Sequence, residues 1–356
     1  EHRTVRFLWM PEFSGTYAWQ AHRPTDTVAA INLDMVGERQ EDCGSTFLLE
    51  GAPHFLGSFA DELVARIRHA AQDWVKDFSG EGHYSLMRMA EVPYSGGSDH
   101  ALWLDPAFGV PCPMLIQWPD RYYHTDLDTP DRVDPSSLAH AVRTAATYAA
   151  CVASVGPAEW RALSILVGRS ARRRMLAALD ARDPRDRAEA ERERGLRALA
   201  SLSRLTLGIP ETHPLAQAWR EGLPLSVEEL EGFWESEIEP ALRHVPSRTP
   251  ATDTRIPVRR LPALLSPIRS LLPNWSQLAV TTRESFLALE GRIPGGSTAL
   301  DLAWFACDGE RSLEAIAQAL TREGHPVTRD DLQSWFGVLA ELGLIRWRDA
   351  SASPED

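Results

Sequence analysis

The sequence predicts an α/β domain with a mixed, largely parallel sheet flanked by helices, followed by two further parts. In the first part, strand-like apolar runs alternate with helical periodicities, which is typical of sheets covered by helices. Strand-like runs then disappear until a short helix, turn, helix and strand pattern near the carboxyl end. We therefore assign an α/β domain, a helical region, a linker and a small C-terminal domain to residues 1–154, 155–245, 246–265 and 266–350, respectively.

Five segments carry the α/β prediction. Apolar, aromatic or β-branched runs predict strands over residues 5–10, 28–34 and 114–118, the first of them buried. Apolar residues at three- and four-residue spacing predict helices over residues 56–78 and 136–152. Such alternation places helices between strands and favours parallel pairing.

The carboxyl-terminal part has clear helix boundaries. Ser312 and Thr328 are typical N-cap residues, and each precedes a run of apolar residues at helical spacing. Gly343 ends the second helix before a strand-like run over residues 344–347. Helix, turn, helix and strand in this order are typical of a winged-helix domain. The preceding linker is predicted from its dense Pro, Thr and Ser content.

Charge and composition argue against several classes of partner. The 356 residues contain 37 Lys and Arg against 50 Asp and Glu, a formal charge of −13. This balance argues against general binding to nucleic acid or a membrane surface. The last predicted helix, over residues 332–342, has no Lys or Arg for phosphate contacts, so nucleic acid is not an expected partner. No apolar run is long enough to span a membrane. Four cysteines without CxxC spacing point to a reducing compartment, and we expect a cytoplasmic protein.

Two residues at strand ends are candidate metal ligands. Asp34 ends the second predicted strand and precedes a turn at Gly37, while His124 follows the strand over residues 114–118. The carboxyl ends of strands in an open α/β sheet form the edge where ligands bind. The sequence therefore predicts a cation site there, although Asp34 alone is equally suited to capping a turn and a single loop histidine is often structural.

Other acidic residues nearby have a simpler interpretation. Asp126, Asp128, Asp131 and Asp134 crowd one loop, but the turn glycine and terminal glutamate of a calcium-binding EF-hand are absent. Asp134 precedes Pro135 and is expected to cap the following helix. Asp99 likewise precedes a short apolar helix signal and suits an N-cap. We interpret most of these carboxylates as local hydrogen-bond acceptors.

Three sequence blocks resemble a known enzyme family. They are Asn32-Leu-Asp-Met-Val-Gly37, Gly97-Ser-Asp-His100 with Phe108-Gly-Val-Pro111, and Tyr123-His-Thr-Asp-Leu-Asp-Thr129. In this order and rough spacing, the blocks are similar to those of the co-catalytic zinc aminopeptidases, which include bacterial leucyl aminopeptidases and glutamate carboxypeptidase. The resemblance covers residues 3–153. It implies a zinc-aminopeptidase-like α/β fold, of which this chain carries the second half onward.

The resemblance implies a role for each of five residues. Asp34 and His124 would each be a ligand of one zinc ion, and Tyr123 would stabilise the tetrahedral oxyanion. Asp99 would fix the site loop, and Glu12 would take the place of the general base. The implied activity is that of a zinc-dependent exopeptidase that hydrolyses an N-terminal peptide or aminoacyl amide bond in a peptide substrate.

The sequence departs from the family pattern in two places. Phe13 stands where the family has a metal-binding glutamate, and the family's His-x-Asp motif, expected before Glu12, is not in this sequence. One or two zinc ions therefore remain alternatives, as does a catalytically degenerate fold that binds a peptide or protein partner. The form Pro11-Glu-Phe-Ser-Gly15 also resembles a subgroup of aminopeptidase-like proteins with a C-terminal winged-helix module, to which residues 300–348 are similar.

The amino end suggests an association. The sequence starts at Glu1 without a methionine and enters the strand-like run over residues 5–10 almost at once. We expect the chain to be the later part of a longer polypeptide. An apolar strand without neighbours leaves a sheet edge exposed, so we expect it to bind the missing amino-terminal part of the catalytic domain, a partner chain or a second copy of itself.

Overall fold

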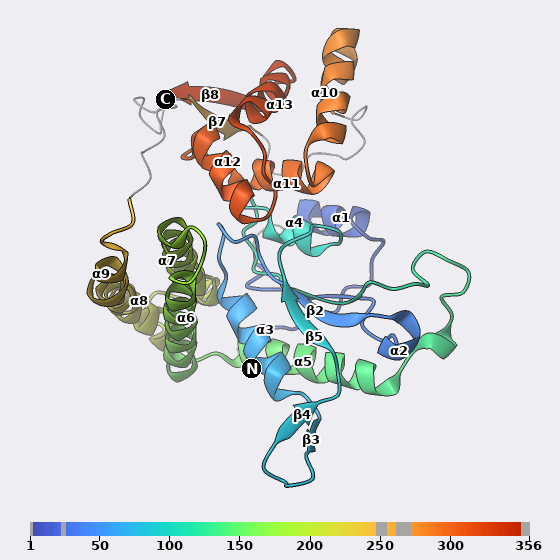
Figure 1. The fold of residues 1–356 in the computed structure, drawn as a ribbon, viewed down its shortest axis with the longest axis vertical. Helices are drawn as coiled ribbons and strands as arrows, with labels where there is room; N and C mark the ends of the chain where they lie inside the picture. The colour runs from blue at the N-terminus through green and yellow to red at the C-terminus, as the bar shows by residue number, and fades with distance from the viewer. Residues whose placement is uncertain (1–2, 23–25, 247–254, 261–271, 350–356) are drawn as a thin grey trace.

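The computed structural model describes residues 3–22, 26–246, 255–260 and 272–349, built around a four-stranded sheet (Figure 1). Its strands are β1 (Asn32–Asp34), β2 (Thr46–Glu50), β5 (Met89–Val92) and β6 (Met114–Trp118), in the order β1-β6-β2-β5. The β1–β6 and β2–β5 pairs are parallel, and the β2–β6 pair is antiparallel. The predicted mixed, largely parallel sheet is therefore confirmed.

Two of the three predicted strands are present. The run over residues 114–118 is β6, as predicted, whereas the run over residues 28–34 is regular only in β1. Upstream of β1, Ala30 N donates to Pro111 O at 2.8 Å and Asn32 N to Pro113 O at 3.0 Å. The proline at each of these positions has no N–H to complete the ladder, so the strand shortens where its partner is proline-rich.

The prediction of a buried strand over residues 5–10 was wrong. This segment is irregular, and its apolar side chains face solvent, with Phe7 77% and Trp9 89% exposed. A strand needs a neighbour for its backbone groups, and no strand among the described residues pairs with this segment. The apolar composition is present, but the described residues supply no neighbour that would make it a strand.

Two long helices cover one face of the sheet. They are α3 (Phe59–Ala70) and α5 (Pro135–Ser154), and the second confirms the predicted helix over residues 136–152. The predicted helix over residues 56–78 was too long. The observed helix α3 is capped by Ser58, begins at Phe59 and ends at Ala70. Trp74, within the range predicted as helix, lies instead in a protruding hairpin formed by β3 (Trp74–Lys76) and β4 (His83–Ser85) (Figure 1).

Short helices connect the sheet elements. They are α1 (Ser14–His22), α2 (Gln40–Cys43), α4 (His100–Leu104) and the 3₁₀ turn η1 (Pro130–Arg132). No helix of the described ranges is both long and apolar enough to cross a bilayer.

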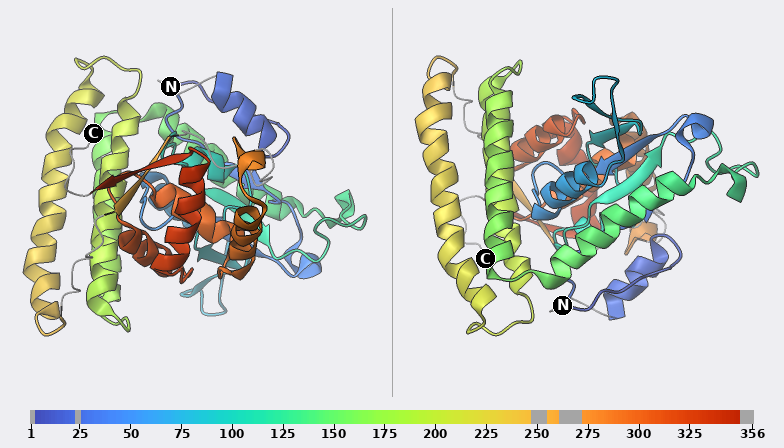
Figure 2. Two further views of the ribbon diagram at one scale, coloured as in Figure 1. Left: turned by 90° about the horizontal axis from the view of Figure 1, so that it is seen from above. Right: turned by 90° about the horizontal axis from the view of Figure 1, so that it is seen from below.

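The region over residues 155–245 is helical, as predicted. It contains α6 (Pro157–Ala178), α7 (Pro184–Ser201), η2 (Leu202–Thr206), α8 (Pro214–Phe233), η3 (Trp234–Ile238) and α9 (Glu239–Leu242). Figure 2 shows these helices running side by side along one flank of the α/β part. Trp160 of α6 is fully buried in one apolar core with Phe47 of β2 and Phe59 of α3. The helical region therefore completes the hydrophobic core of the sheet.

The carboxyl-terminal part confirms the predicted helix boundaries. It contains η5 (Trp275–Gln277), α10 (Val280–Arg292), α11 (Gly296–Ala306), α12 (Leu313–Arg322), α13 (Arg329–Glu341) and β8 (Ile345–Asp349). Ser312 Oγ accepts from Ala315 N at 3.3 Å, and Thr328 Oγ1 accepts from Asp331 N at 3.1 Å. The identification of this part as a winged helix stays a prediction.

Part of the predicted linker is a strand. Residues 247–254 and 261–265 lie outside the described residues, but β7 (Arg255–Arg259) pairs antiparallel with β8. The linker prediction was therefore wrong for β7. Its only alternating apolar residues, Ile256 and Val258, are flanked by arginines and a proline, and the pairing depends on the distant β8.

A buried charge cluster joins the α/β part to α6 and α7. Glu191 accepts from His54 Nε2 at 2.8 Å and from Arg174 Nε at 3.0 Å, and it lies 3.4 Å from Arg187. Burial alone would raise the pKa of Glu191, but the hydrogen bond from His54 and the charge of Arg174 outweigh it and lower the pKa to about 2. The folded protein therefore favours the ionised carboxylate at this junction.

This shift predicts an acid-sensitive contribution to stability. An unfolded glutamate titrates near about 4.3. Because the folded pKa is depressed, the contribution of Glu191 is fully present above that value and is lost as the pH falls towards the folded pKa. We expect Glu191→Gln to lower the free energy of unfolding by about 3 kcal/mol at neutral pH, measured by urea denaturation, with the difference from the parent shrinking below about pH 4. Glu189→Gln, whose side chain is 40% exposed and lies 3.7 Å from Arg185, is the control and should change stability by less than about 1 kcal/mol. A loss that is independent of pH would contradict the assignment.

Candidate functional site

The structure brings Asp34 and His124 to the same edge of the sheet. Asp34 is the last residue of β1 and lies in register with Ile116 of β6. Gln117 N donates to Met35 O at 3.0 Å, which holds the turn after β1 against the end of β6. The chain leaves β6 at Trp118 and reaches His124 within six residues. Both residues therefore follow neighbouring strands at this edge, and their role as metal ligands stays a prediction.

Glu12 and Asp99 approach this edge from two other segments. Phe13 N donates to Asp99 Oδ1 at 2.7 Å, which ties the loop of Glu12 to the start of α4. Asn32 Nδ2 donates to Ser98 Oγ at 2.8 Å, which ties α4 to β1. The Asp99 side chain makes no capping hydrogen bond to α4, so its interpretation as a helix cap was wrong. Its carboxylate instead holds the backbone beside Glu12.

The charges of Asp34, Asp99 and His124 all act on the Glu12 carboxyl, so the candidate residues lie around it. Partial burial and then the negative charge of Asp34 raise the pKa of the Glu12 carboxyl, and Asp99 acts in the same direction. A hydrogen bond with Ser98 and the proximity of His124 oppose this shift without cancelling it. A carboxylate with a raised pKa is a stronger base than an ordinary glutamate, which suits proton abstraction from water.

Unusual backbone conformations gather at the same residues. Phe13, Met35 and His124 have positive φ angles of 55°, 49° and 56°. Left-handed conformations are disfavoured for residues with a side chain, and strain of this kind concentrates at active sites and ligand clamps. Asn274, the only other non-glycine residue with a positive φ among the described ranges, lies far along the chain. Three of the four positions thus adjoin or include Glu12, Asp34 and His124, which favours a functional site.

Aromatic rings form one wall of this edge. The Tyr123 and His124 rings stack with their centroids 3.7 Å apart, and Trp118 packs edge-on against Tyr123 at 5.1 Å. Trp118 and Tyr123 remain 41% and 40% exposed. The rings therefore restrict the His124 loop while leaving Tyr123 accessible from solvent.

Sequence reasoning missed a buried pair beneath the site. His100 Nε2 lies 2.7 Å from Glu50 Oε1, and both side chains are almost completely buried. Glu50 also accepts from Ser95 N at 2.6 Å and Gly96 N at 3.2 Å. Despite its burial, these hydrogen bonds and the charge of His100 lower the pKa of Glu50. The pair anchors the loop that carries Asp99, and its only sequence signals were an acid ending the apolar run of β2 and a histidine after Asp99.

The acidic loop after His124 is built from local hydrogen bonds, as predicted. Asp134 Oδ2 accepts from Ser137 N at 2.9 Å and caps α5. Asp131 accepts from the hydroxyl of Thr129. The Asp131 and Asp134 carboxylates therefore support the loop through local hydrogen bonds.

The residues at this edge suit zinc in chemistry but not in number. Asp34 and His124 are common zinc ligands, and the negative charges of Glu12, Asp34 and Asp99 favour a cation among them. Within the described part of the chain, however, no three His, Cys, Asp or Glu side chains form a group that could hold a metal. Phe13, in the position of a family ligand, offers no donor atom. A complete zinc site thus needs at least one further ligand or a closer approach of these groups.

The comparison with protein families agrees with this arrangement. Residues 13–149 match the family model described as Peptidase family M28, so the match contains Asp34, Asp99, Tyr123 and His124 and begins one residue after Glu12. No curated protein and no solved structure matched the chain. Members of this family are typically zinc-dependent peptidases. Residues 13–149 are therefore similar to peptidase family M28, a family of co-catalytic zinc aminopeptidase-like proteins.

Proposed function

We propose that this protein is a zinc-dependent exopeptidase that hydrolyses an N-terminal peptide or aminoacyl amide bond. The observation that carries the proposal is the convergence of three strained backbone positions, at Phe13, Met35 and His124, on a sheet edge that also holds three carboxylates. The match to peptidase family M28 over the same segments supports it.

Glu12 acts as the general base in this proposal. Its raised pKa favours transfer of a proton from water to the carboxylate, and the same proton is then delivered to the leaving amine. Asp99, through its 2.7 Å bond from Phe13 N, keeps the adjacent backbone in place. Tyr123 donates its phenolic O–H to the oxyanion, a role whose removal typically costs about 10²- to 10³-fold in rate.

Asp34 and His124 are the residues that would hold zinc. Bound zinc lowers the pKa of water and polarises a carbonyl group. A third ligand would come from outside the described residues, which agrees with the predicted association with a further part of the catalytic domain or a partner subunit. Exposed apolar side chains, at Phe7 and Trp9 in the segment before Glu12 and at Leu33 in β1, support such an association.

Zinc content and activity test this proposal together. We expect protein purified without chelators, with the part that supplies the third ligand present, to contain about one or two zinc ions and to cleave aminoacyl amides. His124→Ala should lose both properties, because Asp34 and the third ligand alone hold zinc poorly. His83→Ala, at an exposed position in the β4 hairpin, is the matched control and should keep both. Mass spectrometry gives the metal content, and release of an aminoacyl chromophore gives the rate. Full activity in His124→Ala would contradict the proposal.

A catalytically degenerate peptidase fold is the second candidate. Phe13 in a ligand position and the lack of a three-residue metal group among the described side chains favour it. Under this alternative the protein binds a peptide or protein partner at the same edge without turnover. Peptide binding without zinc and without hydrolysis, unchanged in Glu12→Gln, would favour this alternative.

A further inference from the structure

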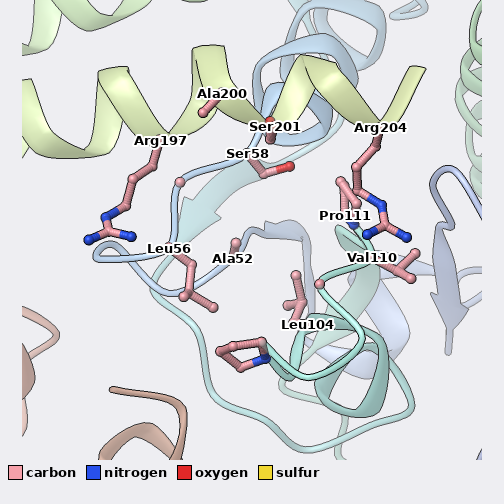
Figure 3. A pocket seen from close by; sticks show the side chains of 13 residues that line it. Ala52, Leu56, Ser58, Leu104, Val110, Pro111, Arg197, Ala200, Ser201 and Arg204 are labelled. Atoms are coloured by element: carbon pink, nitrogen blue, oxygen red, sulfur yellow. The ribbon is translucent and has the colours of Figure 1, made fainter. Parts of the chain in front are cut away.

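A pocket lies at the opposite end of β6 from Tyr123 and His124. Its volume is about 310 Å³, and it opens where loops of the α/β part meet α7 and η2 (Figure 3). Its apolar lining includes Ala52, Leu56, Leu104, Val110, Pro106 and Pro111. Val110 and Pro111 precede β6, whereas the candidate peptidase site follows it. The pocket is therefore separate from the peptidase site, and its volume is at the lower end of the range for small-molecule sites.

The charged residues of this pocket are both arginines. Arg197 and Arg204 line it together with Ser58 and Ser201, and no acidic residue is among the lining side chains. Figure 3 shows the two arginines at opposite ends of the pocket, with the two serines between them. In a chain of formal charge −13, a pocket with this charge is selective for an anion.

Arg204 is the cation that has no counter-ion among the described residues. Its guanidinium donates to three backbone carbonyls, of Thr27 at 2.7 Å, Val28 at 3.4 Å and Phe108 at 3.2 Å. No carboxylate of the described residues lies within ion-pair distance of it. Burial lowers the pKa of Arg204, which reflects the cost of holding this charge away from water. A guanidinium has five N–H donors, so N–H groups remain for a ligand.

The other polar groups of the pocket are already engaged. Arg197 Nε donates to Glu193 at 3.1 Å, Ser58 Oγ accepts from Ala60 N at 3.0 Å, and Ser201 Oγ accepts from Phe59 N at 2.9 Å. A ligand would therefore meet one strong charged donor and an otherwise apolar wall. A single carboxylate attached to an apolar body complements this arrangement, because guanidinium and carboxylate form paired hydrogen bonds. An ammonium group on the ligand would find no acidic partner in the pocket.

From this complementarity we propose that the pocket binds a small monocarboxylate with a branched apolar body and no ammonium group. The carboxylate pairs with Arg204, and the apolar body lies against Leu56, Leu104 and Val110. The α/β part and the helical region both line the pocket, so a bound ligand would contact both parts. The proposal does not depend on the peptidase activity.

Calorimetric titration of the full chain with 4-methylpentanoate tests this site. We expect saturable binding that is at least about tenfold tighter than binding of 4-methylpentanamide, which has the same shape without the charge. Ala200→Phe, at an exposed position in the pocket lining, should abolish binding by filling the volume. Ala146→Phe, exposed on α5 outside the pocket, is the matched control and should leave binding unchanged.

Further probes separate the charge of Arg204 from its structural role. Arg204→Gln should weaken binding of the acid by about tenfold or more and leave the amide unaffected. If that variant unfolds, the comparison of acid with amide and the Ala200→Phe variant still test whether the pocket binds the carboxylate. Equal affinity for acid and amide, binding unaffected by Ala200→Phe, or tighter binding of inorganic phosphate than of 4-methylpentanoate would overturn the proposal.

Discussion

Replacing Glu12 with Gln is expected to reduce the rate of aminoacyl amide hydrolysis by about 10²- to 10⁴-fold, the usual contribution of a positioned general base. The glutamine keeps the size of the side chain but cannot accept a proton. Because Glu12 is exposed, the fold should not change. The measurement is kcat/KM with an aminoacyl chromogenic amide, on protein whose zinc content has been determined.

The zinc content distinguishes loss of the general base from loss of the metal as the cause of a lower rate. Glu12 is assigned to proton transfer rather than to zinc, so Glu12→Gln should keep its zinc while His124→Ala should not. Glu81→Gln, at an exposed position in the β3–β4 loop, provides the matched control. Loss of zinc in Glu12→Gln would instead make Glu12 the missing third ligand, and unchanged kcat/KM would remove it from the mechanism.

Replacing Arg259 with Met is expected to destabilise the protein by about 3–5 kcal/mol, because it leaves a buried carboxylate without its partner. Arg259 of β7 donates to both oxygens of Asp105, at 2.8 and 2.7 Å, and the Asp105 side chain is completely buried. The guanidinium also lies 4.2 Å from the centre of the Trp304 ring. This pair joins the loop after α4 to the carboxyl-terminal part. Urea denaturation of the full chain measures the loss.

A double replacement distinguishes an unpaired charge from lost packing. If the cost arises from the orphaned carboxylate, Arg259→Met combined with Asp105→Leu should recover much of the stability lost in Arg259→Met alone. Arg143→Met, which breaks an exposed pair with Asp73 at 2.9 Å, should cost less than about 1 kcal/mol. A similar cost for Arg143→Met and Arg259→Met would contradict the special role of the buried pair.

Local patterns predicted the elements whose stability is local. The helix α5 begins at its Asp134 cap and has a continuous apolar face, and β6 is a short apolar run bounded by prolines. The edge that joins Asp34 to His124 was also predictable, because both follow strands of one sheet. Their roles as zinc ligands, with Glu12 as base and Tyr123 as oxyanion donor, remain predictions that the proposed experiments test.

Contacts between distant segments decided the rest. Residues 5–10 have the composition of a strand but pair with no strand of the described ranges, whereas β7 has the composition of a linker and becomes a strand because β8 pairs with it. The pair of His100 with Glu50 and the pocket beside Arg204 join residues that are far apart in the chain. Caps, periodicity and strand ends are local, so the α/β class, the helix boundaries and the order of the site residues could be predicted from the sequence. Strand pairing, the burial of charges and the position of the pocket could not, because they depend on which distant surfaces exclude water together.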